Sequence, residues 1–247
     1  AKKAIQELRV KFDKVIVDEA QDIISENYLD VIDSCVHGGL SRGRWTMFGD
    51  FSQQAIYHSS GTGEGLIDIL EARSSFVRFR LTVNCRNTKP ICEEIVSVTG
   101  FEAPSDVWSK VDGVPVEYLT YSSNEEQKNK LIEVIRSLLN NHISPHNISI
   151  LSPVKRENSI VSDIDEFDIH DYKPYRSNRL SICTIQAFKG LENSVVILTD
   201  IKSISDKKLM YIALSRARFG LYVLLSDEAR KEYIQLQSGR MKNGYKA

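Results

Sequence analysis

The chain contains 247 residues with 32 basic and 33 acidic side chains, so its formal net charge of −1 does not by itself predict a nucleic-acid partner. Hydrophobic residues make up 42% and charged residues 26%, which is ordinary for a soluble globular protein and excludes disordered or collagen-like chains. No apolar run approaches the roughly 18 residues that a membrane span needs, so we expect a cytoplasmic protein with no membrane partner.

The cysteine pattern argues against two common metal and redox sites. No two of the four cysteines form a C-x-x-C pair, so zinc-ribbon and thioredoxin-like sites are not expected. Strand-like residues surround the cysteines, which favours reduced thiols in a cytosolic protein. The four residues are Cys35, Cys85, Cys92 and Cys183.

Three short runs in the first part of the chain predict β-strands. Residues 15–17 form a continuous β-branched run with acids after it, and residues 45–48 form an apolar run that ends in Gly49-Asp50. Residues 76–83 alternate apolar and polar side chains, which is typical of a third strand. Because such runs alternate with helical stretches, the sequence predicts an α/β fold built around parallel strands.

A stretch containing proline, glycine and aspartate at residues 101–113 predicts a boundary, so we expect two domains, 1–100 and 101–247. The second domain begins with a predicted strand at 114–119. Ser123 and Glu126 then form a capping box that starts a helix with apolar residues at helical spacing. A strand at 148–151 completes a β-α-β unit. Further predicted elements are strands at 180–184, 195–199 and 221–225 and a helix at 207–218.

The first motif with chemical content is the sequence VIVDEAQD at residues 15–22. An apolar strand followed by two acids, here Asp18 and Glu19, is the arrangement of a Walker B motif. The strand places both carboxylates at the C-terminal edge of a parallel sheet, where ligands bind in α/β folds. Phosphoryl transfer needs one carboxylate for Mg²⁺ and another for the attacking water. A surface turn after a core strand is the alternative interpretation.

Two further segments place polar side chains after predicted strands. Gly49-Asp50-Phe51-Ser52-Gln53 ends with a glutamine that could sense a γ-phosphate or orient water, although a polar turn explains it equally well. In the sequence LTVNCRNT at residues 81–88, Arg86 could reach a phosphate. A surface ion pair is the commoner fate of a single arginine.

The last two motifs lie near the C-terminus. The sequence TIQAFKGLE at residues 184–192 places Lys189, Gly190 and Glu192 after a strand, and the glycine allows close backbone approach. The sequence YIALSRAR at residues 211–218 places Arg216 and Arg218 on the predicted helix. An amphipathic helix with a solvated basic side is the alternative there.

In this order, the five segments resemble motifs II to VI of the superfamily I helicases, and Lys189-Gly190-Leu191-Glu192 indicates the UvrD/Rep-like branch. The resemblance spans roughly residues 15–225. It implies RecA-like parallel sheets, with a partial first lobe (1–100, Walker B and motifs III and IV) and a complete second lobe (101–247, motifs V and VI). In that family, two lobes clamp ATP and its hydrolysis drives movement along single-stranded nucleic acid.

The resemblance also implies roles for individual residues. Asp18 would hold Mg²⁺ and Glu19 would be the catalytic base, while Gln53 would couple the γ-phosphate to lobe movement. Arg86 and Arg216 would be arginine fingers, which can supply on the order of 10³–10⁵ in rate.

The nucleotide-binding set implied by the resemblance comprises five residues. Gly190 would lie on the phosphate side of the cleft and Glu192 would contact the ribose. The full set is Asp18, Asp50, Lys189, Gly190 and Glu192. The implied ligands are ATP and Mg²⁺, and the implied partner is single-stranded DNA, with RNA not excluded.

The sequence departs from the family pattern at several positions. No G-x-x-x-x-G-K-[ST] sequence occurs, so the backbone amides and lysine that hold the β- and γ-phosphates must come from elsewhere. We expect the chain to be the C-terminal part of a longer enzyme whose N-terminal segment carries this P-loop. The chain alone should then bind ATP weakly and not hydrolyse it. Cys85 replaces the family's adenine-stacking tyrosine, and Ser59 stands where a base-stacking aromatic is usual.

Three functions remain to be weighed. The leading hypothesis is the motor end of an ATP-dependent DNA helicase or translocase. The second is a nucleotide-dependent switch or scaffold linked to a nuclease or defence system, without unwinding, which the missing stacking aromatics favour. The third is a purely structural fragment, against which the presence of the acids and arginines argues.

Overall fold

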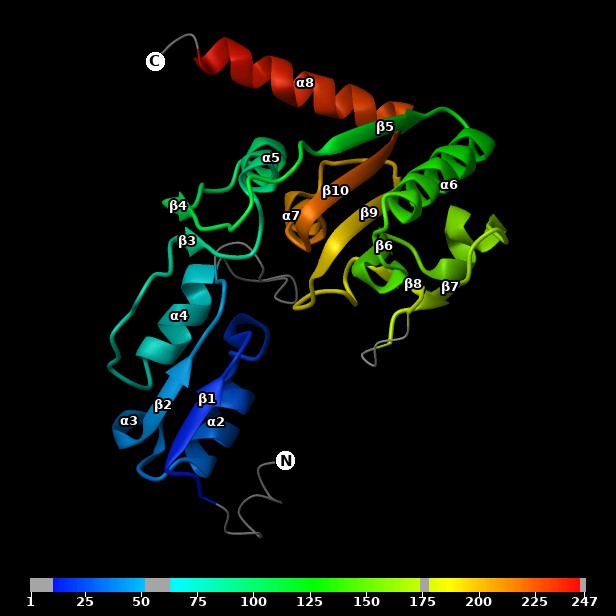
Figure 1. The fold of residues 1–247 in the computed structure, drawn as a ribbon. Helices are drawn as coiled ribbons and strands as arrows, with labels where there is room; N and C mark the ends of the chain where they lie inside the picture. The colour runs from blue at the N-terminus through cyan, green and yellow to red at the C-terminus, as the bar shows by residue number, and fades with distance from the viewer. Residues whose placement is uncertain (1–10, 52–62, 174–177, 245–247) are drawn as a thin grey trace. The chain divides into compact units, whose positions relative to one another are not determined.

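The structure, a computed structural model, describes residues 11–51, 63–173 and 178–244 (Figure 1). The chain divides into two compact units, residues 1–81 and 82–247. The sequence analysis placed residues 82–100 in the first domain, whereas this division places them in the second unit. The segment includes helix α5 (Lys89–Thr99), which packs against elements of the second unit, helix α7 and strand β10.

The first unit contains two parallel strands, β1 (Lys14–Val17) and β2 (Arg44–Met47), whose register pairs Val17 with Met47. Both predicted strands are confirmed, and both end at the same edge of the sheet. Three helices, α2 (Glu26–Cys35), α3 (Gly39–Arg42) and α4 (Gly63–Glu71), and the 3₁₀ turn η1 (Ala20–Asp22) complete the unit. Its core is aliphatic and consists of Val17, Ala20, Ile24, Leu29, Leu40 and Leu70.

The prediction of a strand at residues 76–83 is wrong except at Val83. Only β3 (Val83–Asn84) forms, paired with β4 (Asp106–Val107), and residues 75–82 have no regular secondary structure. The alternating apolar side chains are present but face solvent, with Val77 79%, Phe79 90% and Leu81 86% exposed. A strand needs a neighbour for its backbone hydrogen bonds, and no strand in the described residues pairs with this stretch.

The second unit is built on a six-stranded sheet in the order β5-β10-β9-β6-β8-β7, and every neighbouring pair is parallel (Figure 1). The expected α/β class with parallel sheets is confirmed, and this sheet is consistent with a RecA-like lobe. Its central strands are buried on both faces, as parallel strands usually are. The strands are β5 (Glu117–Tyr121), β6 (Ile148–Ser152), β7 (Ile169–Asp171), β8 (Leu180–Thr184), β9 (Asn193–Ile201) and β10 (Ala217–Ser226).

Helix α6 (Asn124–Asn140) covers one face of this sheet, where Leu131 and Ile135 pack with Ile148, Ile150 and Ile197 in one core. The longest of the other helices is α8 (Asp227–Gly244). Short 3₁₀ turns connect the strands at η2 (Pro145–Asn147), η3 (Arg156–Asn158) and η4 (Ile160–Asp163). None of the helices in the described part of the chain combines the length and the apolar character needed to cross a bilayer.

The predicted capping of α6 is confirmed. The Ser123 hydroxyl accepts a hydrogen bond from the Glu126 backbone N–H at 3.2 Å. In a standard capping box, the carboxylate of the third helical residue accepts from the backbone N–H of the capping residue. Here the Glu126 carboxylate accepts instead from the backbone N–H of Ser122, one residue before the cap, at 2.8 Å. Both contacts fix the start of the helix where the sequence predicts it.

Helix α7 (Lys207–Leu214) ends four residues earlier than predicted. Ser215 caps it, and Ala217 already pairs with Asn193 of β9. The sequence pattern did not show this end, because Met210, Ala213, Leu214 and Ala217 keep helical spacing across it. Arg218 therefore lies on strand β10, and Arg216 lies in the connection between helix and strand.

Candidate nucleotide-binding residues

The acidic turn after β1 holds Glu19 in an unusual backbone conformation. Glu19 has φ 50° and ψ 41°, in the left-handed region, which costs free energy for a residue other than glycine and is often found at functional sites. Its backbone N–H donates to the Asp18 carboxylate at 2.9 Å. Asp18 is exposed, so its carboxylate is accessible to a ligand.

Gln21 connects the two acidic motifs of the first unit. Its side chain is completely buried; its amide donates to the Glu19 carboxylate, and its carbonyl oxygen accepts from the Asp50 backbone N–H at 3.0 Å. A Cβ on Gly49 would lie 2.5 Å from the same oxygen, so a larger residue there would displace the Gln21 side chain. The structure thus brings Glu19 and the Asp50 backbone together through one amide group. The sequence analysis missed this residue, although its place directly after the acidic pair was a signal.

The predicted Mg²⁺ ligand is compatible with this turn. Among the described residues, no three histidine, cysteine, aspartate or glutamate side chains form a metal-binding group. Mg²⁺ typically binds one or two protein carboxylates and fills its other positions with water and substrate phosphates. An exposed Asp18 beside Glu19 fits that limited protein contribution. Gln53 and Ser59 lie outside the described residues.

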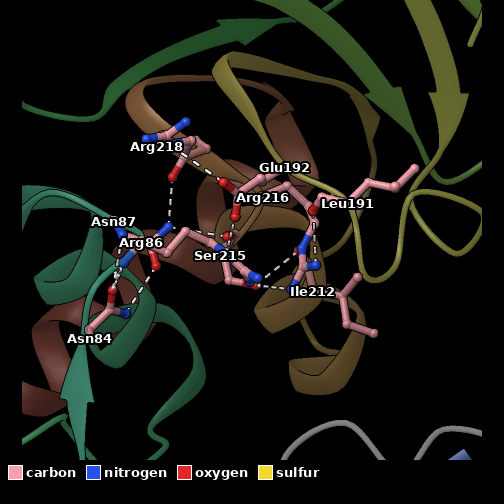
Figure 2. Close-up of polar contacts among 10 residues, drawn as sticks. Asn84, Arg86, Asn87, Leu191, Glu192, Ile212, Ser215, Arg216 and Arg218 are labelled. Atoms are coloured by element: carbon pink, nitrogen blue, oxygen red, sulfur yellow. Dashed lines mark hydrogen bonds and ion pairs between the residues drawn. The ribbon is translucent and has the colours of Figure 1, made fainter. Parts of the chain in front are cut away.

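In the second unit, the Asn84 side chain shapes the turn that carries Arg86 (Figure 2). Its carbonyl oxygen accepts hydrogen bonds from the backbone N–H groups of Arg86 and Asn87, both at 2.9 Å. Its amide donates to the Asn87 side chain at 3.0 Å. One short polar side chain therefore sets the turn after β3, as asparagine commonly does.

Asn87 and Thr88 fasten this turn to the segment between α7 and β10. The Asn87 amide, 2% exposed, donates to the carbonyl of Ser215 at 3.1 Å and to that of Ala217 at 2.6 Å. The Thr88 backbone N–H donates to the Arg218 carbonyl at 3.2 Å. These bonds join segments that are far apart in sequence, since Asn87 and Ala217 are separated by 130 positions. Sequence reasoning did not identify Asn87, because nothing local reveals its distant acceptors.

Arg86, Glu192 and Arg218 form a charged cluster in which two guanidinium groups share one carboxylate (Figure 2). Arg86 Nε lies 2.6 Å from one Glu192 oxygen, and Arg218 Nε lies 3.5 Å from the other. The three side chains are 38%, 39% and 46% exposed, respectively. Two residues predicted for nucleotide contact, Arg86 and Glu192, are thus brought together, and Arg218 joins them.

Arg216 is buried, only 1% exposed, and its guanidinium group binds its own unit (Figure 2). It donates to the Ile212 carbonyl at 2.9 Å, to the Leu191 carbonyl at 3.0 Å and to the Ser215 hydroxyl at 2.8 Å. Its own carbonyl accepts from the Asn193 backbone N–H at 3.0 Å. Arg216 therefore holds the chain on both sides of Glu192, and in this structure its guanidinium does not reach the surface.

Lys189 and Gly190 follow β8, as predicted. Gly190 has φ 81°, a left-handed conformation that glycine adopts without strain, and it is exposed. Lys189 is half-buried in the same turn. The turn leads directly into Leu191 and Glu192, so the fourth motif contributes to the charged cluster.

The four cysteines are free thiols, as expected. Burial, with the Glu93 charge adding to it, raises the pKa of the Cys92 thiol to about 11. Burial likewise raises the pKa of Cys183. Both thiols are therefore weak nucleophiles at neutral pH. Cys85 is exposed in the turn that carries Arg86.

No curated protein matches the chain. Similar solved structures include the C-terminal domain of a possible DNA helicase from Lactobacillus plantarum WCFS1 (13% identity, TM-score 0.46, covering 59% of this chain and 91% of that chain). Two others are the PRRSV helicase (16% identity) and Arterivirus nonstructural protein 10, a helicase (15% identity), both with a TM-score of 0.45. Each of these two matches covers 87% of this chain, which spans only 35% and 39% of the respective viral proteins. A family profile described as an AAA domain matches residues 82–228, more than half of the sequence, and the chain therefore belongs to this AAA domain family.

Proposed function

We propose that the chain is the C-terminal part of an ATP-dependent helicase or translocase of the superfamily I, UvrD/Rep-like type. The complete protein would couple ATP hydrolysis to movement along single-stranded DNA, with RNA as the alternative strand. The AAA domain family supports ATP as the nucleotide. The ordered motifs of the sequence support the helicase assignment.

The observation that carries this proposal is the ion pair between Arg86 and Glu192. These residues are 106 positions apart and come from two motifs that the resemblance assigns to the same nucleotide. The structure places their side chains 2.6 Å apart at the start of β9 and joins them to Arg216 through Leu191. A surface ion pair was the alternative for Arg86, and this pair supports the proposal because its partner belongs to a second motif of the same set.

The first unit would supply the acids of the reaction. Asp18 would bind Mg²⁺, which neutralises charge on the β- and γ-phosphate oxygens when it is bound. Glu19 would accept a proton from the attacking water, and the Gln21 amide would hold that carboxylate in position. Asp50 follows β2 at the same edge of the sheet, and Gln53 would couple the γ-phosphate to movement.

The second unit would supply the cations. Arg86 is partly exposed and already has access to solvent, whereas Arg216 would have to leave three hydrogen bonds to reach a phosphate. Lys189 and Gly190 would lie on the phosphate side of the site, and Glu192 would contact the ribose. Guanidinium groups stabilise the charge that develops on the transferred phosphoryl group.

The P-loop would come from a segment outside these 247 residues. The stretch of residues 75–82 offers a place for it, because Val77, Phe79 and Leu81 alternate as in a strand and remain exposed. A strand added beside this stretch would pair with its backbone, and a layer packed on the same face would cover the three side chains. The P-loop strand would then complete the first lobe.

The direct test is ATP hydrolysis by the complete protein and by a Glu19→Gln variant of it. We expect the variant to lose nearly all turnover while retaining nucleotide binding, because the amide cannot accept the proton. Equal strand displacement by both proteins would exclude Glu19 as the base. The 247-residue chain alone should bind ATP weakly without hydrolysing it, and measurable hydrolysis by it would contradict the need for a separate P-loop.

A nucleotide-dependent switch without unwinding is the second candidate, and the burial of Arg216 favours it. If the Arg216 guanidinium stays buried in its own unit, the protein would bind nucleotide but hydrolyse it slowly. Linkage to a nuclease or defence partner would fit such a switch. Strand displacement by the complete protein distinguishes the two, since a switch would bind nucleotide and strand without separating a duplex.

A further inference from the structure

We propose that Arg218 and Arg86 form a two-guanidinium site for a phosphate group, and that Glu192 occupies this site until the nucleotide displaces it. The inference rests on the proposed function and extends it in two ways. It adds Arg218 as a binding residue, and it gives Glu192 a regulatory role before any contact with the ribose.

The geometry of the cluster is that of a bound oxyanion. Each Glu192 carboxylate oxygen faces a different guanidinium, at 2.6 Å for Arg86 and 3.5 Å for Arg218. A phosphate presents oxygens to two arginines in the same manner, since the planar guanidinium group binds carboxylate and phosphate alike. The carboxylate therefore stands where a phosphate would bind.

The two guanidinium groups come from segments that are fixed to each other. The Thr88 backbone N–H donates to the carbonyl of Arg218, and the Asn87 amide donates to the neighbouring carbonyl of Ala217. The Arg218 guanidinium also lies over the Phe219 ring, 5.2 Å from its centroid, which restricts its orientation. A site whose cations are already held in place loses less conformational entropy when an anion binds.

The electrostatics favour exchange of the carboxylate for a phosphate. The three side chains carry a net charge of +1, and all are more than a third exposed, so the carboxylate can leave to solvent. Exposed ion pairs contribute little to stability, so little opposes its departure. A polyphosphate carries more negative charge than one carboxylate and attracts two guanidinium groups more strongly.

The experiment measures binding of tripolyphosphate and of ATP to the 247-residue chain by calorimetry at low, fixed ionic strength. Glu192→Gln keeps the side-chain volume but removes the competing charge, and should tighten tripolyphosphate binding several-fold. Arg218→Ala should weaken tripolyphosphate binding about tenfold. Arg218→Lys should give an intermediate affinity, because lysine keeps the positive charge but lacks the planar set of guanidinium donors. Arg136→Ala, which breaks an exposed pair with Glu166 in the same unit, is the matched control and should change nothing. Circular dichroism of each variant verifies the fold.

The outcomes separate this inference from the proposed function. It is overturned if Glu192→Gln leaves tripolyphosphate binding unchanged or weaker, if Arg218→Ala has no effect, or if neither the wild-type chain nor Glu192→Gln binds tripolyphosphate. If ATP binding depends on Arg86 but not on Arg218 or Glu192, the inference fails while the nucleotide function stands. If tripolyphosphate follows the expected pattern while the complete protein does not hydrolyse ATP, the anion site stands and the nucleotide function fails.

Discussion

The buried amide of Gln21 donates a hydrogen bond to the carboxylate of Glu19, a residue held in the left-handed region at φ 50°. The same side chain accepts from the backbone of Asp50, so one glutamine holds two motifs that follow different strands. Such a residue keeps a strained turn in one geometry, which a general base requires.

Replacing Gln21 should therefore destabilise the first unit. Gln21→Ala removes partners from the Glu19 carboxylate and the Asp50 N–H, and we expect a loss of about 1–3 kcal/mol in the free energy of unfolding. Trp45 of β2 provides the measurement, by urea unfolding followed through its fluorescence in a Trp108→Phe chain. Gln186→Ala, at an exposed glutamine, is the control and should cost less than about 0.5 kcal/mol. Equal losses in the two variants would contradict the connecting role.

Arg216→Ala should destabilise the second unit by roughly 2–4 kcal/mol, because three acceptors lose a charged, buried donor. Arg216→Lys should recover only part of this, since one ammonium group cannot reproduce the guanidinium geometry. Urea unfolding followed by circular dichroism gives the values. Arg136→Ala removes an exposed arginine, 54% accessible, and should cost less than about 1 kcal/mol. If Arg216→Ala lowers the free energy of unfolding as little as this control does, the buried guanidinium does not stabilise the second unit.

Helix α8 is attached to α5 and β5 by two tyrosines that share Glu94, and this attachment should weaken at alkaline pH. The hydroxyls of Tyr118 and Tyr233 donate to the Glu94 carboxylate at 2.8 and 3.1 Å. Burial and the Glu94 charge raise the pKa of Tyr233 to about 12 and also raise that of Tyr118.

The sign of the pH effect follows from these shifts. A tyrosine in the unfolded chain loses its proton near pH 10, whereas folded Tyr233 keeps it until about pH 12, so stability is full below pH 10 and falls between these values. The urea midpoint should thus decline over this range, and Tyr233→Phe should make the decline shallower. Tyr28→Phe, at a 56% exposed tyrosine, should leave the slope unchanged. An identical slope in the Tyr233→Phe chain would disprove the coupling.

The start of α6 should weaken in acid. The Lys130 ammonium group and the Ser122 hydroxyl and backbone N–H lower the pKa of Glu126 from 4.5 to about 2. Because the folded pKa is lowered, the contribution is present above about pH 4.5 and is lost as the pH falls toward 2. A carboxyl NMR titration should place the pKa of Glu126 well below 4.5. A Glu126 titration near pH 4.5 would rule out the cap as a source of acid sensitivity.

The exposed side chains of residues 75–82 predict self-association of the chain in the absence of a partner strand. Phe79→Asp places a charge at the most exposed of these positions, 90% accessible, and should at least halve the associated fraction. Analytical ultracentrifugation at several concentrations measures this. Val154→Asp changes a less exposed valine in the second unit, 37% accessible, and should have little effect. If Val154→Asp lowers the associated fraction as much as Phe79→Asp does, the association is not specific to residues 75–82.

The sequence predicted those features that depend on local periodicity and on motif position. The parallel strands and the start of α6 follow from apolar runs and a capping serine. The ion pair between Arg86 and Glu192 was not predicted, because the motifs suggested contacts of each residue with the nucleotide and not with one another. The contacts of Gln21, Asn87 and Arg218 could not be predicted in this way, because their partners are set by the folded chain. The end of α7 was misplaced because Ala213, Leu214 and Ala217 keep helical spacing across the boundary between α7 and β10.

The hydrogen bonds from Asn87 and Thr88 to the segment 215–218 have a mechanical consequence. They hold the turn of Arg86 against the segment that carries Arg216 and Arg218, although residues 82–88 follow the first unit directly in the chain. The backbone positions of these three arginines therefore depend on hydrogen bonds made inside the second unit.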